Sequence, residues 1–132
     1  MTSHRPRFPR FPEGSLAVFA ATLVNMLAVG AALPILPRYV EGPLGEGRVQ
    51  VGLVIGAFAF AAIAARPAAG RFGDRRGRKP VMLMGTLMTG TAGAMYALPF
   101  GVAGLVAARI LLGAGEGIVY TSGAAWVADR SN

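Results

Sequence analysis

The sequence contains no cysteine and a single histidine, His4, which lies in the N-terminal tail. A chain without cysteine cannot form a disulfide framework or a cysteine-based metal site. With one histidine it also lacks the histidine clusters that hold metals or act as catalytic bases, and its glycine-rich segment lacks the strand-then-helix setting of a nucleotide-binding loop. We therefore expect no metal, no cofactor and no enzymatic activity.

Charged residues are also scarce. Only 14% of the 132 residues are charged and 54% are hydrophobic, whereas a typical soluble domain has about 25% charged residues. Four runs come close to the ~20 apolar residues that cross a bilayer, at about 16–37, 49–69, 80–100 and 102–128. None is amphipathic, so a soluble bundle of these helices would have no polar outer face. We predict an all-α, polytopic membrane bundle of four helices.

The tail, residues 1–15, mixes Arg, Phe and Pro before the first run. It is interpreted either as an anchor against anionic headgroups or as a specific binding motif. A signal peptide has a similar plan, but this apolar run is long and three more follow, so we expect an uncleaved first helix. Ser15 is placed to act as its N-cap. Pro34 and Pro37 are expected to bend or break the helix near its far end.

The basic residues favour one side of the predicted helices. Three precede the first run, five lie within 70–80 and one follows the fourth, nine in all, while the alternate connections hold only Arg38 and Arg48, each near a glutamate. The positive-inside rule then places both termini and the 70–80 loop in the cytoplasm of a multi-pass cell-membrane protein. The net charge of +7 follows from this topology, because a nucleic-acid-binding protein would gather its charge on one soluble face.

The fourth run carries two ionisable residues, Arg109 and Glu116. Such groups cost roughly 2.5–3.5 kcal/mol each at mid-bilayer, so they are candidates for function. Arg109, Gly113, Glu116 and Tyr120 follow spacings of four, three and four residues, which places them on one helix face. This stripe either bonds another helix or lines a cavity that handles protons or a polar substrate. Asn25, in the first run, has the same two interpretations.

Small residues are frequent in the other runs. Gly52 and Gly56 form a GxxxG pattern in the second run, and Gly85, Gly90 and Gly93 recur in the third. This pattern is typical of helices that pack closely in membranes, so we expect helix–helix contacts at these positions.

The segment GRFGDRRGRKP, residues 70–80, surrounds one acid, Asp74, with five basic residues and three glycines. It resembles the signature loop between the second and third helices of the major facilitator superfamily, Gly-x-Leu-Ala-Asp-Arg-x-Gly-Arg-Lys, and AARPAAGRFGD, residues 64–74, is typical of bacterial drug- and sugar-efflux members. Phe72 and Gly73 replace the usual Leu and Ala. The matching residues are Gly70, Asp74, Arg75, Gly77, Arg78 and Lys79.

A second resemblance lies in the fourth run. Arg109 and Gly113 match the family's second motif, an Arg followed four residues later by Gly, although Leu112 stands where Gln is common. The resemblance implies proton coupling through Arg109, and the stripe alone suggests Glu116 as a proton acceptor.

The resemblance implies a fold of twelve helices in two halves that rock about a midplane site. It also implies that Asp74 and the motif arginines form a cytoplasmic gate with the opposite half. The chain would then be the N-terminal portion of a proton-coupled exporter, with the bilayer, a small-molecule substrate, protons and the remaining helices as partners, and no nucleic acid. Alone, it is not expected to transport. The alternatives are a stand-alone four-helix interaction or regulatory protein and a non-functional truncated gene product.

Overall fold

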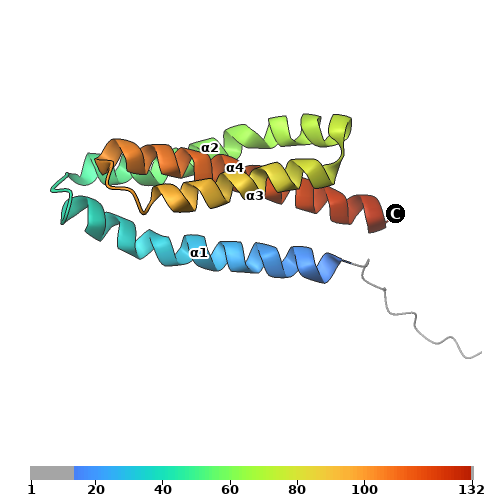
Figure 1. Ribbon diagram of the computed structural model, residues 1–132, viewed down its shortest axis with the longest axis horizontal. Coiled ribbons are helices and arrows are strands. Elements are labelled where there is room, and N and C mark those ends of the chain that lie inside the picture. The colour runs from blue at the N-terminus through green and yellow to red at the C-terminus, as the bar shows by residue number, and fades with distance from the viewer. Residues whose placement is uncertain (1–13, 132) are drawn as a thin grey trace, which may run out of the picture.

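The computed structural model describes residues 14–131, apart from the side chains of Ala28 and Ala32. Four helices follow one another there: α1 (Ser15–Glu41), α2 (Arg48–Arg76), α3 (Arg78–Met95) and α4 (Gly101–Ser131). They alternate in direction, so the start of α1, the α2–α3 junction and the end of α4 lie together, at what we call the Gly77 end of the bundle (Figure 1). The prediction of an all-helical membrane bundle is confirmed. Most of the predicted tail, residues 1–13, lies outside the described residues.

Three of these helices, α1, α2 and α4, are long and apolar enough to cross a membrane. The remaining helix, α3, has 18 residues and begins with Arg78, Lys79 and Pro80. Because α3 is so short, any stretch of it long enough to cross a membrane includes this polar start, and that stretch is less apolar than those of the other three helices. The expectation of four spanning helices is therefore confirmed for three.

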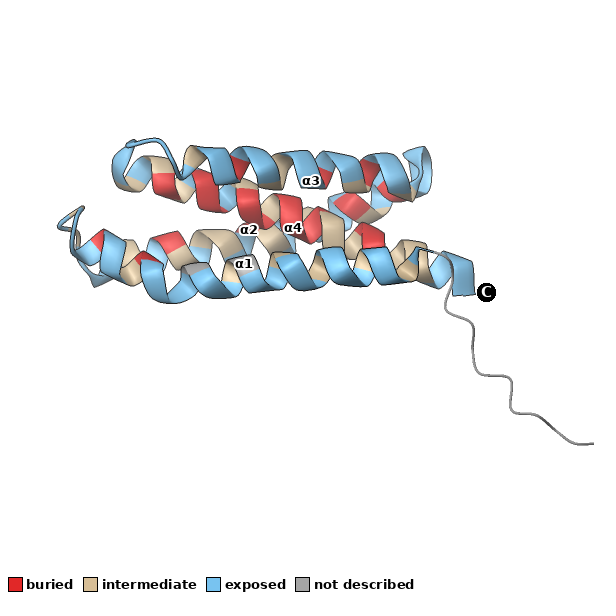
Figure 2. Cartoon of the chain, turned by 60° about the horizontal axis from the view of Figure 1, so that its bottom comes forward, coloured by how far each residue is buried: buried red, intermediate tan, exposed pale blue. Residues whose placement is uncertain are grey.

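The centre of the bundle is α4, which packs mainly against α2 and α3. Half of its apolar window is buried, whereas none of the corresponding window of α1 is. Figure 2 shows the buried positions concentrated along α4, whereas α1 is mostly exposed, with some half-buried positions along it. Two small apolar clusters support this arrangement, one around Val40, Val54 and Leu105 and one around Val81 and Ile118. The polar residues of α4, and of the two helices that enclose it, are therefore the first candidates for function.

Glycines allow α4 to approach its neighbours closely. A Cβ at Gly113 or Gly117 would overlap the backbone carbonyl of Phe58 or Ala62 in α2, and a Cβ at Gly115 would lie 2.8 Å from the carbonyl oxygen of Gly85 in α3. Gly113 and Gly117 thus form a GxxxG face toward α2, as expected where membrane helices pack through small residues.

The glycine packing predicted from the sequence is confirmed only at Gly85. Nothing lies within 4 Å of a Cβ built at any of the others, namely Gly52, Gly56, Gly90 and Gly93. Their spacing is that of packed helices, but their sides of α2 and α3 are turned away from the rest of the described chain.

The predicted loop 70–80 is wrong in extent, because it is helical except at one residue. α2 continues to Arg76 through Pro67, and α3 starts at Arg78. Gly77 makes the turn alone with φ = 90°, a conformation that glycine adopts at little cost, and its N–H donates to the carbonyl of Gly73 at 3.0 Å. Charge and glycine content predicted an open loop here, but neither prevents a helix from continuing.

The start of α1 also differs from the expectation, because Ser15 is the first helical residue and not the N-cap. The N-cap is Gly14, with φ = 91° and no side-chain hydrogen bond to the cap. Its carbonyl accepts from Val18 N–H at 3.1 Å, and its Cα faces the Trp126 indole of α4. The close indole and the left-handed backbone both suit a residue without a Cβ.

The far ends of α1 and α3 depart from the prediction in opposite ways. Helix α1 does not break at Pro34 or Pro37 and continues to Glu41. Helix α3 stops at Met95 and not near Phe100, because the chain turns there through hydrogen bonds such as that from Leu98 N–H to the Met95 carbonyl at 3.1 Å. The Glu41–Arg48 connection is a turn, as its Gly and Pro content indicated.

Candidate functional site

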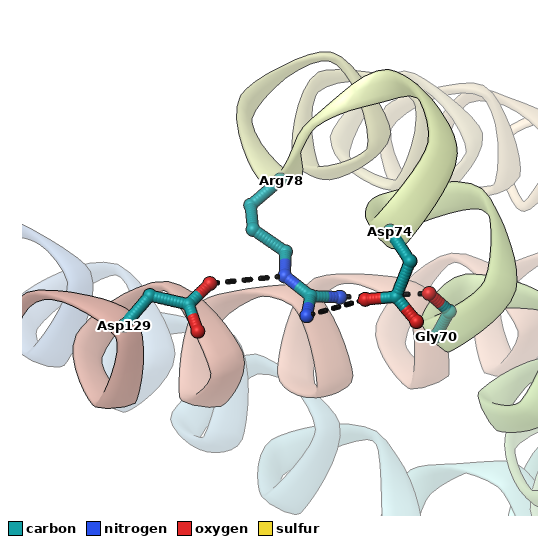
Figure 3. A network of polar contacts seen from close by, with 4 residues as sticks. All are labelled: Gly70, Asp74, Arg78 and Asp129. Atoms are coloured by element: carbon teal, nitrogen blue, oxygen red, sulfur yellow. Dashed lines mark hydrogen bonds and ion pairs between the residues drawn. The ribbon is translucent and has the colours of Figure 1, made fainter.

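The best-defined polar site in residues 14–131 is a network at the Gly77 end, centred on Arg78 (Figure 3). Its guanidinium forms an ion pair with Asp74 (Nη2–Oδ1, 2.7 Å) and another with Asp129 (Nε–Oδ2, 3.3 Å). It also donates from Nη1 to the backbone carbonyl of Gly70 at 3.5 Å. One side chain thereby ties the end of α2 and the start of α3 to the last turn of α4.

Local structure explains this geometry. Asp74 and Arg78 are four residues apart but belong to different helices, and the single-residue turn at Gly77 brings them face to face. Gly73 leaves space for the arginine, because a Cβ there would lie 2.5 Å from Arg78 Nη1. The glycines of the segment therefore serve two purposes, a tight turn and room for a cation.

The charge distribution in the network is uneven. The Arg78 side chain is 20% exposed, whereas those of Asp74 and Asp129 are 68% and 61% exposed. A guanidinium can serve two carboxylates through its separate N–H groups, and such charge-assisted hydrogen bonds are stronger than neutral ones. The exposed carboxylates keep free acceptor positions on their solvent-facing sides. The network can therefore hold the helix ends together and still accept a further donor.

Two of the predicted motif residues, Arg75 and Lys79, are not drawn into the network and stay exposed. Asp129 was missed by the sequence reasoning, although it is near the end of the predicted fourth helix. An available signal was the orientation of the helices, since that end was predicted to lie on the same side as residues 70–80, which carry an excess of basic charge.

The second candidate site is the polar stripe on α4, where Arg109 is 1% exposed and Glu116 is 2% exposed. The Arg109 Nε donates to the carbonyl of Val54 at 3.3 Å, and its Cζ lies 4.7 Å from the centre of the Phe58 ring. Both partners belong to α2, so the structure shows the arginine bonding a neighbouring helix, which is one of the two interpretations that the sequence allowed.

The structure brings Arg109 and Glu116 onto the same side of α4 without joining them. The described residues include no ion pair between these two, as expected for groups two helical turns, about 10 Å, apart. Several buried polar atoms on this helix have no hydrogen-bond partner in the described chain: Arg109 Nη1, Glu116 Oε1, Tyr120 Oη and Ser122 Oγ. Buried polar atoms are usually paired, so these unpaired atoms make the stripe on α4 the second candidate for a functional site.

The other stripe residues have different positions. Gly113 is a packing contact against Phe58 and does not line a cavity. Asn25 of α1 is half-buried, and no hydrogen bond to its side chain is seen among the described residues. None of the stripe residues lines the groove between α2 and α4 or the hollow on the surface of α2.

The sequence matches a known protein family over most of its length. The family model described as Major Facilitator Superfamily matches residues 18–132. The chain belongs to the Major Facilitator Superfamily. The match includes α2, the Gly77 turn, α3 and α4, and therefore every residue of the two candidate sites. Together with the helices long and apolar enough to cross a membrane, this family membership indicates a multi-pass membrane protein.

Individual superfamily members show how much of a relative the chain represents. It is 34% identical over 119 residues to uncharacterized MFS-type transporters of Burkholderia mallei (strain SAVP1) and Burkholderia pseudomallei (strain K96243). Each alignment covers 84% of this chain and 29% of the relative. A Pseudomonas aeruginosa (strain LESB58) transporter is equally similar, with 30% of its length covered. The chain therefore spans less than a third of these relatives. No solved structure gives a significant match.

Proposed function

We propose that this chain supplies the first four helices of a secondary active transporter that exports a small molecule in exchange for protons. Membership of the superfamily and the MFS-type transporters among its relatives support transport. The share of those relatives that the chain covers, 29%, supports the view that further helices complete the transporter. The excess of basic residues at the Gly77 end supports its placement on the cytoplasmic side of the cell membrane.

The single observation that carries the mechanism is the Arg78 network. Three helix ends meet at one guanidinium, and Asp74 and Asp129 remain more than half exposed. A donor from the remaining helices can bind either carboxylate when the two halves of the transporter close at this end. We call this contact between the two halves the latch. It consists of charge-assisted hydrogen bonds that form in one state of the transporter and break in the other.

Energy coupling is assigned to α4 in this proposal. Glu116 is a buried carboxylate with one oxygen unpaired, which makes it the candidate proton acceptor. Tyr120, one turn further along, offers a hydroxyl that can hydrogen-bond to the substrate or relay the proton. Arg109 bonds the backbone of α2, so a change of charge at Glu116 can alter how α4 is held against α2. Asn25 on α1 is proposed to line the same cavity as the polar stripe of α4.

The latch is tested in the natural reading frame, including all coding sequence that follows Asn132. Asp74→Asn and Asp129→Asn remove one carboxylate charge each, and Glu41→Gln removes one at the opposite end of the bundle. Efflux of a panel of fluorescent dyes from cells is measured, together with the amount of protein in the membrane. Both Asn variants are expected to slow efflux at least tenfold at equal abundance, and the Gln variant is not. Undiminished efflux in both Asn variants would remove the latch.

Proton coupling is tested with Glu116→Gln, which keeps the shape of the side chain and removes its charge. Everted membrane vesicles with an acridine dye report proton movement when a transported dye is added. The variant is expected to exchange the dye down its gradient while no longer moving protons. Glu46→Gln, in the Glu41–Arg48 connection, is the control. Proton movement that survives in Glu116→Gln would assign coupling to another group.

A stand-alone four-helix membrane protein that interacts or regulates is the alternative, and one observation favours it. The described chain has an open, apolar groove of about 460 Å³ between α2 and α4, with Leu53, Phe60 and Ile110 exposed in it. In a protein that acts alone, a second copy of the chain can pack into this groove. A stable oligomer of the 132-residue chain in detergent, together with a stop codon directly after Asn132, would favour this alternative or a non-functional truncated product over the transporter.

A further inference from the structure

Most cations of the 70–80 segment take no part in the Arg78 network. Four of the five are exposed, and in residues 14–131 they have neither an ion pair nor a side-chain hydrogen bond: Arg71, Arg75, Arg76 and Lys79. Five cations and one acid leave a net charge of +4 between Gly70 and Lys79. The one acid of the segment, Asp74, pairs with Arg78, so the other four cations have no acidic partner within the segment.

Two of these arginines share a hollow on the surface of α2. Arg71 and Arg75, one helical turn apart, line a half-open hollow of about 260 Å³ together with Ala68 and Phe72. These four positions follow spacings of three and four residues, so they occupy one face of the helix. Phe72 is 48% exposed. The hollow therefore combines two fixed positive charges with an apolar lining of aromatic and methyl surface.

The position of the hollow along the helix narrows the chemistry of its ligand. With 29 residues, α2 is about 43 Å long, which exceeds the ~30 Å hydrocarbon core of a bilayer. Its last turns therefore reach the headgroup layer, where phosphate groups are dense. Arginine is well suited to phosphate because its planar fork binds two oxygens at once.

We propose that this hollow is a binding site for an anionic phospholipid. Arg71 and Arg75 hold the phosphodiester, while Phe72 and Ala68 contact the glycerol and the first acyl carbons. A soluble phosphate would use the two arginines alone and gain nothing from the apolar half of the lining. The proposal does not depend on transport, because it concerns only a surface of α2 that the described chain leaves open.

The test uses the purified 132-residue chain in detergent and native mass spectrometry. Phosphatidylglycerol and phosphatidylcholine with identical acyl chains are titrated, and the wild type is expected to bind the anionic lipid more tightly. Arg71→Gln with Arg75→Gln should weaken that binding roughly thirtyfold, since each basic residue near a membrane surface contributes ~1 kcal/mol and 1.4 kcal/mol is a factor of ten. The matched control, Arg38→Gln with Arg48→Gln, removes two charges at the opposite end and should bind as the wild type does.

A second pair of substitutions separates a built site from diffuse attraction. Arg71→Lys with Arg75→Lys keeps the charge and loses the forks, so its affinity should lie between those of the wild type and the Gln variant. Wild-type affinity in the Lys variant, or equal losses in the Gln variant and its control, would overturn the proposal. Displacement of the lipid by millimolar inorganic phosphate would also overturn it, in favour of a free-anion site. Helicity and elution volume verify folding, and if the Gln variant misfolds, the Lys variant decides alone.

Discussion

Arg78 and Asp129 are joined by an ion pair of 3.3 Å between Nε and Oδ2, although 51 residues separate them in the chain. The first residue of α3 is thereby fixed to the last turn of α4. This contact adds to the close α3–α4 packing at Gly85 and Gly115, and the same guanidinium also pairs with Asp74. The position of the α2–α3 turn is therefore set by the end of α4 as well as by Gly77.

The first prediction concerns the strength of this tie. Asp129 is 61% exposed, and exposed ion pairs contribute about 0.2–1 kcal/mol. A double-mutant cycle of Arg78→Gln and Asp129→Asn, measured by unfolding in mixed micelles, should give a coupling free energy in that range. The cycle of Arg76→Gln with Asp129→Asn is the control and should give none, because Arg76 has no such pair. Equal coupling in both cycles would mean that Asp129 senses only the general positive charge of the segment.

The second prediction concerns Gly73, where alanine is usual in the superfamily motif. A Cβ there would lie 2.5 Å from Arg78 Nη1 and 3.1 Å from its Cδ, so Gly73→Ala must displace the guanidinium. The displacement is inexpensive because the end of the arginine is flexible, and we expect little change in stability. The Arg78–Asp129 coupling, measured in the Gly73→Ala background, should fall by at least half. Gly70→Ala, where nothing lies within 4 Å, should leave the coupling intact, and an unchanged value in Gly73→Ala would contradict the contact.

The third prediction compares two identical substitutions in similar sequence patterns. Gly113→Ala places a methyl group on the Phe58 carbonyl, and overpacking of this kind costs about 1–3 kcal/mol. Gly52→Ala points into the open groove and should be neutral or stabilise α2 by up to about 1 kcal/mol. Unfolding in mixed micelles measures both. If Gly52→Ala were the more destabilising of the two, the open side of α2 would have to be covered in the folded protein.

The two GxxxG patterns show what the sequence could and could not predict. Long apolar runs and Gly- or Pro-rich breaks are local signals, so the number and order of the helices followed from them. Which small residues pack depends on how neighbouring helices are rotated and shifted, and Gly52–Gly56 and Gly113–Gly117 have the same spacing. The structure places the second pair in contact and leaves the first exposed. Spacing alone could not distinguish them.

The Arg78 network shows the same limit at the candidate site. Asp74 and the motif cations were found because they are close in sequence and resemble a known pattern. Asp129 contributes through the register between α3 and α4, which no local signal determines. The extent of the 70–80 segment was misjudged because a single left-handed glycine at Gly77 is enough to reverse the chain.

The last prediction tests how Arg109 is held. Its guanidinium contacts both the Val54 carbonyl and the Phe58 ring, and a desolvated cation–π contact contributes about 2 kcal/mol. Phe58→Leu removes the ring and leaves the buried cation with the Val54 carbonyl, so stability should fall by about 2 kcal/mol or more. Phe60→Leu makes the same change at a side chain that is 77% exposed and should have little effect. In an Arg109→Met background the difference between the two phenylalanine variants should shrink by about 2 kcal/mol, because the cation that the ring contacts is gone. A difference that persists in full would mean that Phe58 acts through its packing alone and that Arg109 is held only by the backbone of α2.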